Sequence, residues 1–239
     1  MINKVTFSCL SILLVTLFLT SCASVPIENR IDHLPMYGQP EIPRPEHLIK
    51  ADEDFIKRAA AGFGGDRHQA SMAWHSAAEK YMSEGNSYYA MRRYNQSWLL
   101  DPENYLPYWG FGRVMVDRDK IDEAIKYFET ANALINDPYQ KSSLLSDTGS
   151  VYSYKAESIP SEKITERKYY FDLANQYFKN STSDDPSYPV PWYRWAISLY
   201  EQGRYEDAWE KVNKALQLGA ENLDVFLREL ENKMPNPNQ

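Results

Sequence analysis

Residues 121–136, which read IDEAIKYFETANALIN, decide the fold of this chain. Ala124, Phe128 and Ala131 follow one another at spacings of four and three, so they share one face of an α-helix. That face carries two small residues and one large aromatic side chain. Small residues let a second helix approach closely, and the aromatic ring fills the remaining space. The stretch therefore predicts a helix that packs tightly against its neighbours.

Similar stretches occur three more times in the same register. We expect four units, at residues 71–104, 105–138, 142–188 and 189–222. Their small positions are Ala78, Ala90 and Ser97, then Gly112, Ala124 and Ala131, then Gly149, Ala174 and Ser181, and finally Ala196, Ala208 and Ala215. No unit can bury its apolar face alone, so the units must stack into an array.

The third unit is interrupted between its two helices. Tyr152 and Ala174 lie about 13 positions further apart than the corresponding residues of the repeat pattern. The extra residues are at roughly 156–168. Pro160 lies in this insertion, and proline breaks a helix or begins one. We therefore expect a lengthened turn, followed by a longer second helix at about residues 161–180.

The period of about 34 residues, with aromatic and small residues at fixed positions, resembles the tetratricopeptide repeat (TPR) family. The resemblance implies an all-α solenoid of antiparallel helix pairs, which here would occupy residues 66–233. An added N-terminal helix and glycine loop are expected at residues 51–65, with Asp52 as the helix N-cap. A C-terminal capping helix is expected at residues 223–233, before a tail at 234–239.

The first 21 residues are typical of a secretory signal, with Lys4 before a short apolar segment. The segment ends in Leu-Thr-Ser-Cys at residues 19–22, which resembles the lipobox of bacterial lipoproteins. The resemblance implies that Cys22 becomes the acylated N-terminus, and Ala23 after it favours the outer membrane. Several acyl chains are needed because one chain holds a protein only weakly to a bilayer. The alternative is an ordinary signal peptide with an incidental cysteine.

Residues 22–50 are expected to form a proline-rich tether. Fully extended at about 3.1 Å per residue, it could reach about 85 Å from the membrane. Its apolar residues, including Ile31, Leu34 and Tyr37, are unusual for a pure spacer. We therefore expect part of the tether to lie along the repeat domain. Asp66, with Gln69 three residues later, predicts the start of the first repeat helix.

Neither composition nor motifs indicate catalysis. The net charge of −7 argues against a nucleic-acid partner. Residues 62–65 are glycine-rich but lack the lysine that follows in a phosphate-binding loop. His68, His75 and Glu79 have spacings that a metal could use, yet they complete no metal motif, so we interpret both histidines as surface residues. We predict no catalytic residue, metal or cofactor. The 18 tyrosines and 6 tryptophans fit helix packing better than an aromatic ligand cage.

In the TPR family the first helix of each unit lines a concave groove. Transferred to this chain, the candidate groove residues are His75, Glu79, Trp109, Arg113, Tyr154, Tyr193 and Ile197. Tryptophan, tyrosine and arginine dominate binding hot spots, although packing within the array is the alternative role. TPR domains that clamp a terminal carboxylate use Lys and Asn at positions where this chain has Glu79 and Gly110. We therefore expect no such clamp.

Together these features predict a membrane-anchored adaptor on the periplasmic face of the bacterial outer membrane. Its partners would be other envelope proteins, bound through the groove. The alternative is a regulatory subunit of an envelope enzyme that associates with saccharide or peptidoglycan, with aromatic groove residues stacking on sugars. A hydrolase would require carboxylates in a cleft, which the sequence does not reveal.

Overall fold

The computed structural model describes residues 30–237, and every regular element in that range is helical. Two short 3-10 helices, η2 (Ile31–His33) and η3 (Pro35–Gly38), precede the α-helices. The α-helices are α1 (Glu46–Ala61), α2 (Arg67–Ser83), α3 (Ser87–Leu100), α4 (Tyr105–Asp117), α5 (Ile121–Leu134), α6 (Pro138–Ser158), α7 (Ile164–Asp184), α8 (Pro189–Glu201), α9 (Tyr205–Gln217) and α10 (Asp224–Lys233). None of the helices in this range is long and apolar enough to cross a membrane.

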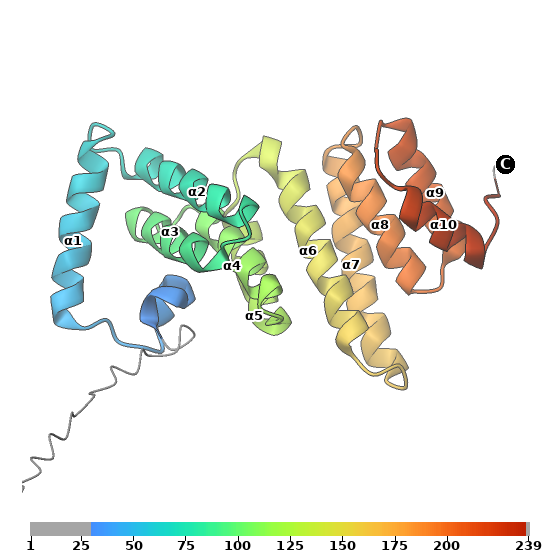
Figure 1. Ribbon diagram of the computed structural model, residues 1–239, viewed down its shortest axis with the longest axis horizontal. Helices are drawn as coiled ribbons and strands as arrows, with labels where there is room; N and C mark the ends of the chain where they lie inside the picture. Colours follow the sequence, from blue (N-terminus) through green and yellow to red (C-terminus); the bar gives the residue numbers. More distant parts are fainter. Residues whose placement is uncertain (1–29, 238–239) are drawn as a thin grey trace, which may run out of the picture.

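The helices pack as successive pairs, α2 with α3, α4 with α5, α6 with α7 and α8 with α9. Figure 1 shows the pairs following one another along the long axis, with α1 at one end and α10 at the other. The predicted all-α solenoid, with an added helix at each end, is confirmed. The predicted signal peptide at residues 1–21 and the predicted lipidation site, Cys22, lie outside the described residues.

The small positions of the repeat are the points of closest helix packing. Ala78, Ala90, Ser97, Ala124, Ala131, Ala174, Ser181, Ala196, Ala208 and Ala215 are all completely buried. Gly110 of α4 shows how close the approach becomes. The ring of the fully buried Tyr94 from α3 lies against the α4 backbone there, and a Cβ at Gly110 would meet Tyr94 Cδ1 at 2.5 Å. A side chain at this position is therefore excluded by the Tyr94 ring.

The insertion in the third unit lengthens both of its helices. α6 and α7 each contain 21 residues and are joined by the short turn at residues 159–163. The expectation of a long turn was wrong, because both chain segments continue as helix. Ala156 near the end of α6 and Ile159 in the turn are buried within the inserted residues, so the insertion buries apolar surface of its own. The joined ends of α6 and α7 extend past the neighbouring pairs in Figure 1.

The first α-helix begins at Glu46, six residues before the expected N-cap at Asp52. Pro45 directly precedes α1 and Glu46 lies in its first turn, where a negative charge is favourable. Asp52 lies inside the helix and forms a two-bonded ion pair with Arg44, both N–O distances being 2.7 Å. The predicted start of the first repeat helix, α2, at Asp66 is confirmed, because Asp66 Oδ1 accepts a hydrogen bond from the Gln69 amide at 2.9 Å.

Residues 30–45, which we call the strap, lie against α3 through the two 3-10 helices η2 and η3. Asn95 of α3 is fully buried and its Nδ2 donates to the carbonyl oxygens of Asp32 and Leu34, at 3.2 and 2.9 Å. Its Oδ1 accepts from the Tyr37 amide at 3.3 Å. His33 is completely buried against the ring of Tyr88, with centroids 3.6 Å apart. Part of the expected tether thus belongs to the repeat domain.

Candidate binding groove

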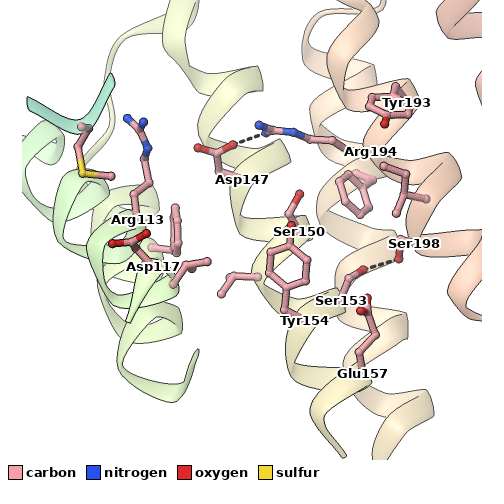
Figure 2. A pocket seen from close by; sticks show the side chains of 16 residues that line it. Arg113, Asp117, Asp147, Ser150, Ser153, Tyr154, Glu157, Tyr193, Arg194 and Ser198 are labelled. Carbon is pink, nitrogen blue, oxygen red and sulfur yellow. Dashed lines mark hydrogen bonds and ion pairs between the residues drawn. The ribbon is translucent and has the colours of Figure 1, made fainter. Parts of the chain in front are cut away.

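A pocket of about 460 Å³ lies between α4, α6 and α8. Close backbone contacts join α2 to α4 and α6 to α8, whereas α4 and α6 stand further apart. The pocket fills this gap, as Figure 2 shows. Its lining residues are Met82, Arg113, Val116, Asp117, Phe128, Asp147, Ser150, Val151, Ser153, Tyr154, Glu157, Phe178, Tyr193, Arg194, Ile197 and Ser198.

The floor of the pocket is apolar because it is the outer surface of the repeat core. Phe128 and Phe178, the aromatic residues of α5 and α7 that fill the space between helices, are almost fully buried and still reach the pocket. Val151 is also buried, and Val116 and Ile197 are partly buried beside it. The pocket therefore offers apolar surface to a ligand at the centre and polar groups around the edge.

Arg113 lines one side of the pocket and is paired with an acid of the preceding unit. Its Nη1 lies 2.6 Å from Glu79 Oε2, and the Tyr94 hydroxyl donates to Glu79 Oε1 at 2.5 Å. Burial would raise the pKa of Glu79, but the hydrogen bonds from Tyr94 and Arg113 outweigh it and keep the pKa below its usual value. Glu79 is therefore ionised, and both of its carboxylate oxygens have partners within the fold.

His75 lies beneath this ion pair rather than on the surface, so the expectation of a surface histidine was wrong. Its side chain is only 12% exposed, and its Nε2 lies 3.6 Å from Glu79 Oε1. Burial lowers the pKa of His75 to about 4, against a smaller opposing effect of Glu79. The imidazole is consequently neutral at pH 7 and forms part of the packing around Tyr94, whose ring centroid is 5.4 Å away.

Asp147 of α6 connects the three groove helices. It accepts a hydrogen bond from Trp109 Nε1 of α4 at 2.7 Å, and its other oxygen pairs with Arg194 of α8. Figure 2 shows the Asp147–Arg194 pair at the side of the pocket occupied by Arg113. These bonds hold α4 and α8 to α6, so Trp109 connects helices of the scaffold rather than lining the pocket.

Two further carboxylates line the pocket, Asp117 of α4 and Glu157 of α6, and Figure 2 shows them on opposite sides of it. Asp117 is the last residue of α4, and Glu157 lies one residue before the end of α6. The Glu157 side chain reaches water, yet partial burial and the nearby Glu201 carboxylate raise its pKa to about 7, against a smaller effect of Arg167. Neither carboxylate forms an ion pair within residues 30–237.

Four of the seven predicted groove residues line the pocket, namely Arg113, Tyr154, Tyr193 and Ile197. Glu79 is bound behind Arg113, and Trp109 and His75 lie outside the lining. The structure adds lining residues that the sequence did not indicate, Asp147, Ser153, Glu157, Arg194 and Ser198. Asp147 and Arg194 share the sixth position of consecutive units with opposite charges, a signal that could have revealed their pairing.

Within the described residues, no group of three or more His, Cys, Asp or Glu side chains is placed to hold a metal ion. The pocket's own ionisable groups are arranged as ion pairs, or as carboxylates on separate helices. The arrangement suits recognition of a charged, partly apolar ligand.

The sequence matches no family model and no curated protein. Solved structures do match it. TTC0263, a thermophilic TPR protein of Thermus thermophilus, superposes with a TM-score of 0.60 at 14% identity, over 70% of this chain and 84% of that one. The fold is a TPR solenoid. PilF of Pseudomonas aeruginosa gives a TM-score of 0.54 at 17% identity, over 81% of this chain and 88% of that one.

Cut9, from the APC/C hetero-tetramer Cut9–Hcn1, gives a TM-score of 0.56 at 16% identity over 79% of this chain. The match covers 33% of Cut9, so this TPR solenoid spans about a third of that protein's length. At such low identities the likeness extends to the fold alone.

Proposed function

We propose that this protein is a membrane-anchored, non-catalytic TPR adaptor of the bacterial cell envelope. It binds an extended segment of another envelope protein in the pocket between α4, α6 and α8. The observation that carries the proposal is the pocket itself, about 460 Å³ on the groove side of the array, with an apolar floor and a charged edge. Pockets of a few hundred Å³ are large enough for several side chains.

The pocket suits a peptide better than a flat protein surface. Hollows of this kind take the protruding side chains of a segment, while polar groups at the edge bind its backbone. Tyr154, with 48% of its surface exposed, and Tyr193 provide aromatic contacts at the edge. Such rigid aromatic residues beside an apolar hollow are typical of binding hot spots.

The support for membrane anchoring comes from the lipobox-like sequence that ends at Cys22. The proposal expects a diacylated or triacylated Cys22 that holds the protein at the outer membrane. Cys22→Ala should move the protein from the membrane fraction to the soluble periplasmic fraction and abolish its labelling with radioactive palmitate. A Cys22→Ala protein that stays in the membrane fraction would contradict the anchoring proposal.

The groove proposal is tested by site-specific crosslinking in living cells. A photo-reactive amino acid replaces Tyr154 at the edge of the pocket, and in a control replaces Val225 of α10, which is 62% exposed. Crosslinked products are purified and identified by mass spectrometry. The proposal expects one or a few envelope proteins at position 154 that are absent at position 225. The same products at both positions, or glycan alone at position 154, would refute it.

A second variant shows whether the crosslinks depend on the hollow. Ser150 lines the pocket, and Ser150→Trp should fill part of it without removing any ion pair. We expect this substitution to abolish the crosslink formed at position 154. Trp109 and Arg113 are poorer test positions, because each binds a carboxylate that holds helices together.

A further inference from the structure

The seventh residue of each of the last three units contacts the second helix of the unit before it. Phe111 of α4 packs edge to face on Tyr94 of α3, with ring centroids 6.3 Å apart. Thr148 of α6 accepts a hydrogen bond from Asn132 of α5 at 2.7 Å. The indole of Trp195 in α8 donates a hydrogen bond to a side chain of α7 at 2.9 Å. Within the array, this face of the first helix is therefore covered by another helix.

In the first unit no helix covers that face. Its seventh residue, Ala77 of α2, is exposed. A second pocket of about 460 Å³, which we call the N-terminal pocket, lies there, and Ala73, Trp74, Ala77 and Tyr81 of α2 line it. Small residues at positions 73 and 77 allow a helix backbone to approach closely, with an aromatic ring beside each of them. Because the outer face of a terminal unit is usually polar, this apolar surface suggests that something packs on it.

Helix α1 lies on this side of the array without filling the N-terminal pocket. Its C-terminal half packs on the beginning of α2, where Phe55 meets Trp74 edge to face with ring centroids 5.6 Å apart. Figure 1 shows α1 meeting α2 at one end and standing apart from it toward the other. In that other half, Ile49 is 44% exposed. No residue of α1, all of which the structure describes, lines the pocket.

The N-terminal half of α1 is held away from α2 by the strap. Arg44 of the strap pairs with Asp52 of α1, and its guanidinium lies over the Tyr37 ring, 3.9 Å from the centroid. Tyr37 is buried, and its amide donates to Asn95 of α3. Closing α1 onto α2 would break these contacts. The N-terminal pocket therefore stays open to another molecule.

Two cations line the N-terminal pocket without an acidic partner. Lys80 is exposed and Arg93 is partly buried, and neither forms an ion pair within residues 30–237. Arg93 Nη1 donates instead to the neutral side chain of Gln96 at 2.7 Å. Glu84, which follows the last residue of α2, also lines the pocket and is not paired with either cation. In a protein of net charge −7, this local excess of positive charge favours an acidic ligand.

We propose that the N-terminal pocket binds an amphipathic α-helix of a partner protein, with acidic residues of that helix facing Lys80 and Arg93. The bound helix takes the place that the second helix of the preceding unit has elsewhere in the array. Its apolar side packs on Ala73 and Ala77, in the manner of a helix in a groove. This site is separate from the pocket between α4, α6 and α8, and the proposal does not depend on the function proposed for that pocket.

The test begins with a photo-reactive amino acid in place of Ala77 in the full-length protein in living cells. The control carries it in place of Val225, which is 62% exposed on α10. Crosslinked partners are identified by mass spectrometry, and the crosslinked segment is mapped and synthesised as a peptide. Fluorescence anisotropy then measures its affinity for the purified full-length protein in detergent. Circular dichroism shows whether the peptide becomes helical when it binds.

The charge of the helix is tested with Lys80→Gln combined with Arg93→Gln. Two exposed ion pairs, each contributing a factor of about two to three, should make binding about fivefold weaker in this variant. The matched control is Lys179→Gln with Arg228→Gln, at exposed positions of α7 and α10, and it should change binding less than about twofold. Replacing the acidic residues of the peptide by glutamine should remove the difference between the variant and the control.

The proposal expects a product at position 77 that is absent at position 225, formed with a segment that is helical when bound. It is overturned if the two positions give the same products or none, or if the bound segment is not helical. It is also overturned if the segment binds the main variant and the control equally. A second copy of this chain as the product at position 77 would overturn it too, because the surface would then join copies of the protein.

Discussion

Replacing Gly110 by alanine should destabilise the array, although alanine is the better helix former. The new Cβ would lie 2.5 Å from Cδ1 and 2.6 Å from Cζ of the Tyr94 ring, where ordinary contacts begin near 3.4 Å. The ring is completely buried between α3 and α4, so it cannot swing into solvent. Either the two helices separate by about 1 Å or Tyr94 leaves its position.

The size of the effect follows from three contributions. Overpacking a buried site costs about 1–3 kcal/mol. Displacing the Tyr94 hydroxyl from Glu79, now 2.5 Å away, costs a further ~1.5–3 kcal/mol, because the bond involves a charged acceptor. The higher helix propensity of alanine stabilises the helix by about 0.5–1 kcal/mol and offsets part of this cost. We therefore expect Gly110→Ala to lower the free energy of unfolding by about 2–5 kcal/mol.

Urea unfolding followed by far-ultraviolet circular dichroism measures this difference. Gly62→Ala is the matched control, since its Cβ would meet only the Ala59 carbonyl oxygen, at 3.4 Å. It should change stability by less than about 1 kcal/mol. In a Tyr94→Leu background, Gly110→Ala should cost at least about 1 kcal/mol less. Equal costs in both backgrounds, or a Gly110→Ala protein as stable as the wild type, would refute the reasoning.

Three further predictions concern the strap and two titrating groups. Asn95→Ala should lower the free energy of unfolding by about 2–3 kcal/mol, because two carbonyl groups and one amide of the strap lose their hydrogen-bond partner. The same variant should be cleaved faster by proteases within residues 30–45, and an unchanged rate of cleavage would contradict this. The raised pKa of Glu157 means that the folded state holds its proton more strongly, so stability from this group falls as pH rises through about 7. Glu157→Gln should therefore raise the melting temperature more above pH 7 than below pH 5, and a pH-independent difference would argue against it. The pH dependence of stability that comes from His75 has the opposite sign, because its pKa in the folded state, about 4, lies below the usual value of 6.5. Its contribution is fully present above pH 6.5 and is lost as pH falls toward 4, by about 3 kcal/mol; His75→Phe should flatten that part of the stability profile measured by urea unfolding.

The repeat could be read from the sequence because each unit uses the same contacts. Ala124, Phe128 and Ala131 describe a local face, and three other copies in register make the stacking unavoidable. The length of the insertion could also be read, but not its shape. Whether the extra residues form a long turn or extend two helices depends on how much apolar surface they bury in the folded chain, as Ala156 and Ile159 do.

The candidate site was only partly predictable, for a different reason. The register placed Arg113, Tyr154, Tyr193 and Ile197 on the groove side, and they line the pocket. The register cannot show which groove residues already have partners within the fold. Trp109 resembled a free hot-spot residue, yet its indole donates to an acid 38 positions away in the chain. Such pairings depend on how consecutive units are rotated, which no single unit encodes.

The strap has a consequence for where the pocket can operate. Because the segment from Arg30 onward is bound to the domain, only residues 23–29 separate Cys22 from the first described residue, Arg30. At about 3.5 Å per step, the eight steps from Cys22 to Arg30 span at most ~28 Å, against about 85 Å for a free tether ending at residue 50. If Cys22 is lipidated, Arg30 stays within that distance of the bilayer. The search for a partner then becomes nearly two-dimensional. Proteins anchored in the same membrane present their segments to the pocket at a high effective concentration, so binding can occur even when each single contact is weak.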